Sequence, residues 1–223
     1  MTAPRIERLS EGVTLWLADC REILPQLGRF DAVVTDPPYG LGDKMQGGTW
    51  GAKAGFKEMA RWDRAPPEEQ VLRDLIGLSK HQIFWGGQYF ALPPARCWLI
   101  WNKTNAVPTM ADFETAWTNL DRPSKRFDAP VGRVEYGHAT QKPLPLMMWT
   151  LGFVASARTI LDPFCGTGTT GVAAVKLGRR FVGIEIEPKY FEVARRRISD
   201  ALREPDMFVA PVATPPKQGA LDL

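Results

Sequence analysis

The sequence predicts an α/β fold built on a doubly wound, mostly parallel sheet. Short β-type apolar runs alternate with segments of helical periodicity along most of the 223 residues. This alternation is typical of parallel strands with helices covering both faces of the sheet. The length allows one such domain with a full core and is too short for two, so we expect a single domain.

The first half of the chain contains clear strand patterns. We expect strands at 13–19, 31–36, 81–87, 97–103 and 113–118, with a short helical or turn-like connection after the first of them. A helix pattern starts at about Pro66, with apolar residues at Val71, Leu72, Leu75, Ile76 and Leu78. Residues 40–65 lie between the second strand and this helix. They are glycine-rich without an apolar period, which predicts a long, mobile loop.

The second half alternates helices and strands more regularly. We expect a helix at 143–154, a strand at 158–162, a helix at 169–178 closed by a glycine, and a strand at 179–185. Pro188 opens a last helix, whose apolar residues lie along one stripe. The chain is proline-rich from Glu204 onward. We therefore expect residues 1–203 to form the domain and residues 204–223 to form a flexible tail.

Composition excludes several classes of protein. The 44% hydrophobic and 24% charged fractions are those of an ordinary soluble globular protein. No apolar run reaches membrane-spanning length and the first residues lack the apolar core of a secretory signal, so we expect a cytoplasmic protein. Three scattered cysteines and two histidines support neither a disulfide framework nor a zinc site, and we expect no metal. The net charge of +3 is compatible with a polyanionic partner without requiring one.

A glycine-rich turn marks the first candidate site. Residues 160–171 read I-L-D-P-F-C-G-T-G-T-T-G and match G-x-G-x-x-G from Gly166 to Gly171. Such a turn lets a ligand approach the backbone, and the helix that follows presents unpaired N–H groups. Glu185 ends the next strand, where an acid usually binds ribose hydroxyls. The pattern predicts a nucleoside-containing ligand, and a dinucleotide is one form that such a ligand can take.

The stretch T-D-P-P-Y-G at 35–40 marks the second candidate site. The prolines stiffen the backbone, so the Asp36 carboxylate and the Pro37 carbonyl are held as two convergent acceptors. Two acceptors suit an exocyclic amine, which offers two hydrogens. Tyr39 offers a flat face on which a base can stack. From these residues alone, a strand-terminating turn is an equally good interpretation.

Together the two motifs resemble those of the S-adenosylmethionine-dependent amino-methyltransferases of DNA. The hallmarks of that family look like D-P-P-Y at 36–39 and D-P-F-C-G-T-G-T-T at 162–170, and H-A-T-Q-K-P at 138–143 is similar to a third family element. The catalytic motif precedes the cofactor box, which matches the circularly permuted, β-type order of compact phage-type or orphan members. The resemblance implies a Rossmann-like sheet of the class I methyltransferase type.

The resemblance also implies roles for individual residues. The catalytic motif would consist of Asp36, Pro37, Pro38 and Tyr39. The residues that would hold S-adenosyl-L-methionine lie in the cofactor box and at neighbouring strand ends, and they are Asp19, Gln141, Lys142, Asp162, Phe164, Gly166, Gly168, Thr169 and Glu185. Asp19 is equally well explained as a helix cap. Cys165 lies in the cofactor box, and we assign it no catalytic role.

Basic residues outside these motifs are candidates for contacts with DNA. An amine inside a duplex is out of reach, so the base must be flipped into the pocket. We expect the loop and a short target-recognition segment at 119–137 to contact phosphates through Lys44, Lys53, Lys57, Arg61, Arg122, Lys125, Arg126 and Arg133. For Arg195, Arg196 and Arg197 on the last helix we expect solvated surface charge.

These features predict a DNA adenine-N6 methyltransferase. Asp36 favours adenine because cytosine-N4 members usually carry a serine at that position, and cytosine N4 is the alternative target. A dinucleotide-binding oxidoreductase and an inactive DNA-binding protein are alternatives of other classes. DNA is the expected partner and a cognate restriction endonuclease is a further candidate, while the recognition sequence and the oligomeric state stay open.

Overall fold

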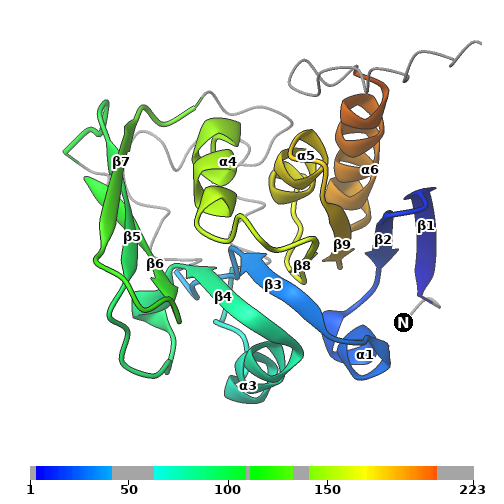
Figure 1. The fold of residues 1–223 in the computed structure, drawn as a ribbon, viewed down its shortest axis with the longest axis horizontal. Coiled ribbons are helices and arrows are strands. Elements are labelled where there is room, and N and C mark those ends of the chain that lie inside the picture. Colours follow the sequence, from blue (N-terminus) through cyan, green and yellow to red (C-terminus); the bar gives the residue numbers. More distant parts are fainter. Residues whose placement is uncertain (1–3, 42–62, 109–110, 133–140, 205–223) are drawn as a thin grey trace, which may run out of the picture.

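A computed structural model describes residues 4–41, 63–108, 111–132 and 141–204, and it shows one large sheet with helices on both sides (Figure 1). The strands are β1 (Arg5–Ser10), β2 (Val13–Leu17), β3 (Phe30–Thr35), β4 (Ser79–Trp85), β5 (Trp98–Lys103), β6 (Phe113–Thr118), β7 (Lys125–Ala129), β8 (Thr159–Asp162) and β9 (Arg180–Glu185). The helices are α1 (Cys20–Ile23), α3 (Glu69–Leu78), α4 (Leu144–Gly152), α5 (Thr169–Lys176) and α6 (Pro188–Arg203), with short 3₁₀ turns η1 (Leu24–Gln26) and η3 (Gly87–Tyr89).

The sheet has the order β1-β2-β9-β8-β3-β4-β6-β5-β7. Strands β2, β9, β8, β3 and β4 are parallel neighbours, whereas β1 and β6 each run antiparallel to the strands beside them. The prediction of a mostly parallel sheet is therefore confirmed.

Both faces of the central strands are buried, as their continuous apolar runs require. Helices α4, α5 and α6 cover one face, and α1 and α3 cover the other (Figure 1). Successive residues of one strand serve opposite faces: Val34 of β3 belongs to the core under α4–α6, and Val33 belongs to the core under α1 and α3. Phe191 of α6 is fully buried in the first of these cores, and Leu75 of α3 is fully buried in the second.

Two strands lie outside the sequence-based prediction. Strand β1 alternates charged residues with Ile6 and Leu9 and is largely exposed at the sheet edge. Strand β7 forms the opposite edge and lies inside the segment expected to recognise the target. Edge strands bury little apolar surface, so their sequences lack the apolar run by which the central strands were identified.

Two boundaries also differ from the prediction. The first long helix starts at Glu69 and not near Pro66. The fourth strand ends at Trp85, because Gly86 takes a left-handed conformation with φ +71° and turns the chain into η3. That turn brings Gly86 against Tyr39, where an added Cβ would lie 2.0 Å from Tyr39 Cε1.

The parallel strands place their carboxyl ends at one edge of the sheet. Strand β8 lies between β9 and β3 in the sheet. Helix α5, which follows β8 in the chain, and helix α3, which follows β3, lie on opposite faces of the sheet (Figure 1). Ligands of open α/β sheets bind in the crevice that such a reversal of strand order creates. Thr35 at the end of β3 and Asp162 at the end of β8 mark this crevice, and Thr35 Oγ1 donates to Asp162 Oδ1 at 2.6 Å.

Candidate active site

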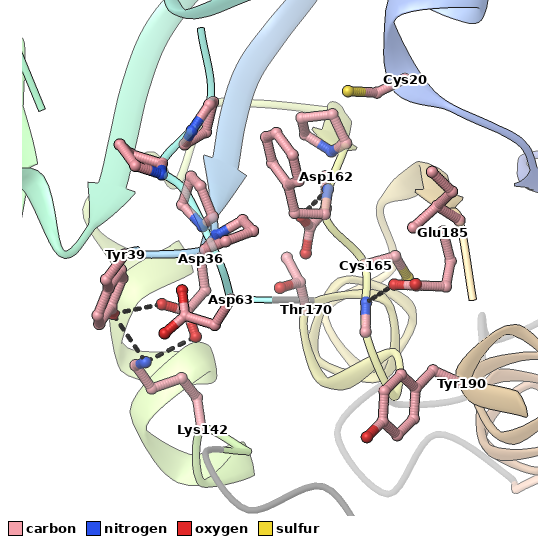
Figure 2. Close-up of a pocket in the computed structure, with 18 of the residues that line it drawn as sticks. Cys20, Asp36, Tyr39, Asp63, Lys142, Asp162, Cys165, Thr170, Glu185 and Tyr190 are labelled. Atoms are coloured by element: carbon pink, nitrogen blue, oxygen red, sulfur yellow. Dashed lines mark hydrogen bonds and ion pairs between the residues drawn. The ribbon is translucent and has the colours of Figure 1, made fainter. Parts of the chain in front are cut away.

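A cavity of about 720 Å³ lies at this crevice, and both sequence motifs line it. Figure 2 shows Asp36, Tyr39 and Lys142 together on one side and Asp162, Cys165 and Glu185 on the other. The predicted residues that line the cavity are Asp19, Asp36, Pro37, Pro38, Tyr39, Gln141, Lys142, Asp162, Phe164, Gly166, Thr169 and Glu185. The two motifs therefore open onto one shared space.

Gly168 is the exception among the predicted cofactor residues, because it serves the packing of the turn. It has φ +81° at the N-terminus of α5, and an added Cβ would lie 2.9 Å from the Ala194 Cβ of α6. A side chain at this position would separate α6 from the turn. Gly168 thus acts on the cavity by setting the path of the backbone.

Glu185 joins the tip of β9 to the glycine turn. Its Oε2 accepts from the Gly166 amide at 2.6 Å, and its Oε1 accepts from the Glu187 amide at 2.8 Å. Burial raises the pKa of this carboxyl to about 7, although the two amide donors oppose the shift. The turn therefore holds an acid that is partly protonated at neutral pH.

Asp162 has a similar environment on the neighbouring strand. It accepts from Thr35 Oγ1 and from the Phe164 amide, and burial raises its pKa to about 6. Cys165, which follows it, is buried, and that burial raises the pKa of its thiol well above the usual range. A thiol in this state is a poor nucleophile.

Arg197 of α6 lies outside the motif but donates hydrogen bonds to the glycine turn. Its Nη1 donates to the Thr167 carbonyl at 2.6 Å, to Thr167 Oγ1 at 3.0 Å and to Thr169 Oγ1 at 3.2 Å. The expectation of solvated surface charge at Arg197 is therefore wrong. The helical stripe of apolar residues on α6 indicates which face is buried, but it does not show that the arginine beside it meets a turn 30 residues earlier in the chain.

Asp36, the first residue of the D-P-P-Y motif, accepts hydrogen bonds from two donors. Tyr39 Oη donates to Asp36 Oδ1 at 2.5 Å, and Lys142 Nζ donates to Asp36 Oδ2 at 2.6 Å (Figure 2). Burial raises the pKa of Asp36, and Lys142 opposes that shift. The Asp36 side chain is 25% exposed, so the carboxylate keeps a face toward the cavity.

Tyr39 already stacks on an aromatic ring of the protein. The rings of Tyr39 and Tyr89 lie 5.0 Å apart with an interplanar angle of 22°. Rings this close leave no room for a base between them. A base that stacks on Tyr39 must therefore use the other face of the ring or displace Tyr89, which the sequence did not identify as a site residue.

Lys142 makes more contacts than its motif predicts. In addition to Asp36, its Nζ lies 2.9 Å from Glu114 Oε2 and 3.1 Å from Tyr39 Oη. Glu114 of β6 and Lys103 of β5 also line the cavity. Glu114 is the second residue of β6 and Lys103 is the last residue of β5, and no sequence motif identifies either of them. The predicted contact of Lys142 with the cofactor stays a prediction.

Asp63 stabilises the chain that follows the catalytic motif. Asp63 is 4% exposed, and its carboxylate accepts from the Gly40 amide at 2.7 Å and from the Leu41 amide at 3.2 Å. It thereby joins the two described ends that flank residues 42–62. Asp63 is a further residue that lines the cavity and that the sequence did not single out.

Asp19 caps the start of α1. It accepts from the Arg21 amide at 2.9 Å, and its Oδ2 lies 2.6 Å from the Arg21 guanidinium, which holds the pKa of Asp19 below its usual range. Because Asp19 also lines the cavity, the cap does not exclude a ligand contact. Its predicted role toward the cofactor stays a prediction.

The predicted DNA-contacting residues that the structure describes do not line the cavity. Lys125 and Arg126 are exposed on the edge strand β7, and the Arg122 guanidinium lies 4.9 Å from the centre of the Phe153 ring. Lys44, Lys53, Lys57, Arg61 and Arg133 lie outside the described residues, as do the tail after Glu204 and most of the expected loop.

Two further properties concern only the part of the chain that the structure describes. It contains no helix with the length and apolar character needed to cross a bilayer. It also contains no cluster of three or more histidine, cysteine or acidic side chains placed to hold a metal ion.

Comparison with solved structures defines the class of fold. The structure of M1.HpyAVI in complex with SAM superposes with a TM-score of 0.56 at 23% identity, over 83% of this chain and 98% of that chain. The PvuII DNA methyltransferase, described as cytosine-N4-specific, gives a TM-score of 0.54 at 14% identity, over 86% of this chain and 92% of that chain. The fold is therefore the Rossmann-like α/β fold of class I methyltransferases, as predicted.

Sequence comparison then defines the family. The DNA methylase family N6_N4_Mtase matches residues 94–196. The Type II methyltransferase M2.LlaDCHI of Lactococcus lactis subsp. cremoris is 45% identical over 256 aligned positions, which cover 89% of this chain and 93% of the relative. M2.DpnII of Streptococcus pneumoniae is 50% identical over 62 residues, and this match covers only 27% of this chain and 23% of that protein. The chain belongs to the N6/N4 family of DNA methylases.

Proposed function

We propose that this protein transfers a methyl group from S-adenosyl-L-methionine to the exocyclic N6 amine of a flipped adenine in DNA. The observation that carries the proposal is the shared cavity, in which the Asp36 carboxylate and the glycine turn face one space. A reacting amine on one side and a nucleoside-containing donor on the other need this arrangement.

The described residues fit the cofactor. Glu185 is an acceptor suited to ribose hydroxyls, and no described side chain caps the start of α5 at the turn. Gln141 Oε1 is buried and accepts no hydrogen bond from the described residues, although Gln141 lines the cavity. An ammonium group of the ligand would satisfy that oxygen. S-adenosyl-L-methionine supplies an electrophilic methyl group when it is bound.

The chain's own contribution to the reaction is orientation of the amine. The lone pair of an exocyclic amine is delocalised into its ring. Hydrogen bonds to Asp36 and to the Pro37 carbonyl would favour a tetrahedral nitrogen whose lone pair faces the methyl group. Pro37 and Pro38 hold this acceptor pair stiffly, so little ordering is required at the moment of reaction. The methyl group would pass directly to the nitrogen as its bond to sulfur breaks, without a covalent enzyme intermediate; the thioether product would leave and the methylated nitrogen would lose one proton.

Contacts with DNA lie beyond the cavity. We assign the phosphates to the basic residues of the loop and of segment 119–137, of which Lys125 and Arg126 are exposed on β7. The relatives that match are named Type II methyltransferases, which supports a partner restriction endonuclease and action on cytoplasmic DNA.

The product identifies the target base. Purified protein is incubated with cofactor and unmethylated DNA, and the nucleosides are analysed by mass spectrometry. N6-methyladenine is expected. Cytosine N4 is the second candidate, because a solved protein of the same fold is described as cytosine-N4-specific. N4-methylcytosine as the sole product would replace the adenine assignment.

The role of Asp36 is tested separately. Asp36→Ala is expected to abolish methyl transfer and to leave cofactor affinity within about threefold of wild type, because Asp36 contacts the amine and not the cofactor. Asp74→Ala, an exposed aspartate on α3, is the matched control and is expected to keep full activity. Retention of transfer by Asp36→Ala would refute the proposed mechanism.

A further inference from the structure

Asp36 is the last member of a chain of alternating charges. Lys103 Nζ lies 2.6 Å from Glu114 Oε1, Glu114 Oε2 lies 2.9 Å from Lys142 Nζ, and Lys142 Nζ lies 2.6 Å from Asp36 Oδ2. The groups come from β5, β6, the segment before α4 and the end of β3. Two cations and two carboxylates therefore balance one another at the wall of the cavity.

Burial differs along this chain of charges. The Lys142 and Lys103 side chains are 5% and 8% exposed, whereas Glu114 and Asp36 are 20% and 25% exposed. A buried lysine stays charged only when acids compensate its desolvation. Burial alone would lower the pKa of Lys142, but Asp36 and Glu114 raise it to about 12. Burial also opposes ionisation of Glu114, but Lys142 and Lys103 hold its pKa at about 2.

The hydrogen-bonding capacity of Lys142 is fully used. An ammonium has three donors, and three acceptors lie within 3.1 Å of Nζ: Asp36 Oδ2, Glu114 Oε2 and Tyr39 Oη. Both oxygens of Glu114 are also paired with cations. Each oxygen of Asp36 accepts from a single described donor, so the carboxylate keeps further lone pairs, and its side chain is 25% exposed.

We propose that Lys142, fixed by Glu114 and Lys103, is a positioning residue that keeps Asp36 ionised and aligns its remaining lone pairs with the target amine. This inference rests on the proposed role of Asp36 as an acceptor of that amine. Protonation would convert one oxygen of Asp36 into a donor, which an amine hydrogen cannot use. Lys142 thus acts on the reaction through Asp36 and not by touching the substrate.

The two neighbours of Asp36 shift its protonation in opposite directions. Without Lys142, burial and the negative charge of Glu114 both favour the protonated form, so the pKa of Asp36 rises. Without Glu114, a repelling charge is lost while Lys142 remains, so the pKa falls. Tyr39, Lys103 and Asp162 of β8 also face this region, and they are the same in every variant compared below.

The sign of each shift can be read from the rate of methyl transfer. Transfer requires ionised Asp36, so the rate is high above the pKa of Asp36 and falls as the pH drops through it. Lys142→Met is expected to move this acid limb upward by about one pH unit or more, and Glu114→Gln is expected to move it downward. Damage to the fold would lower the rate without producing shifts of opposite sign.

The experiment is a single-turnover assay from pH 5 to pH 9 with unmethylated DNA and with cofactor saturating at every pH, so that pH-dependent cofactor binding does not limit the rate. Glu192→Gln is the matched control, because Glu192 also pairs with two arginines but is 45% exposed on α6. Its profile is expected to overlay that of wild type. Cofactor affinity is measured for every variant by calorimetry, and folding by circular dichroism.

The possible results separate the inference from the proposed function. Opposite shifts with unchanged cofactor affinity support the inference. An unshifted acid limb in Lys142→Met, with cofactor affinity lowered at least tenfold, overturns it and assigns Lys142 to the cofactor. If Lys142→Met does not fold, the direction of the Glu114→Gln shift decides. If the wild-type protein methylates no DNA, the proposed function itself is refuted, and this result is obtained without the variants.

Discussion

Replacing Glu185 by glutamine is expected to change how the stability of the protein depends on pH. Glu185 is 9% exposed, and burial raises its pKa from 4.5 to about 7. A carboxyl with a raised pKa in the folded state binds its proton more tightly there than in the unfolded chain. Its contribution to stability is therefore fully present below about pH 4.5 and is lost as the pH rises toward 7.

The magnitude follows from the two pKa values. One pKa unit corresponds to about 1.4 kcal/mol, so between pH 5 and pH 8 the wild-type protein should lose roughly 2 to 3 kcal/mol relative to Glu185→Gln. In Glu185→Gln the side-chain NH₂ would face one of the two backbone N–H groups that donate to Glu185, which would lower the free energy of unfolding by about 1 to 3 kcal/mol. That cost does not depend on pH, so the difference between the two pH values isolates the charge.

Urea unfolding of the cofactor-free protein at pH 5, 6, 7 and 8 measures this difference. Glu11→Gln, an exposed glutamate in the turn between β1 and β2, is the control and should follow the wild-type protein at every pH. If the stability difference between wild type and Glu185→Gln were the same at pH 5 and pH 8, the argument that burial raises this pKa would be refuted.

Two further predictions concern the supports of the cavity. Gly86→Ala would place a Cβ 2.0 Å from Tyr39 Cε1, so we expect it to lower the rate of methyl transfer more than tenfold while cofactor affinity is retained. Gly77→Ala is the control, because an added Cβ there meets nothing within 4 Å, and its transfer rate should equal that of wild type. Equal single-turnover rates for the two variants would contradict this prediction. Arg197→Met removes the bonds to Thr167 and Thr169 and should weaken cofactor binding about tenfold in calorimetry, with the exposed Arg196→Met as its control. Unchanged affinity in Arg197→Met would show that the turn keeps its shape without this brace.

The central fold and the two motifs could be predicted because they depend on local patterns. Apolar runs identify β3, β8 and β9 whatever the rest of the chain does, since a parallel strand is buried on both faces. The acids at the strand ends and the glycines of the turn also follow directly from those runs. In a parallel sheet the carboxyl ends share one edge, so the meeting of Asp36 with Glu185 at one cavity followed from topology.

The tertiary structure alone decided which groups complete the site. Lys103 and Glu114 are linked to Asp36 through Lys142 because β6 inserts antiparallel between β4 and β5, and no local period encodes that pairing. The contact of Arg197 with the glycine turn and the stacking of Tyr89 on Tyr39 also join segments whose meeting no local pattern encodes. Local sequence determines where a side chain points along its own element. The charge that it faces depends on packing between elements distant in the chain, and this packing sets the ionisation of the acids at the cavity.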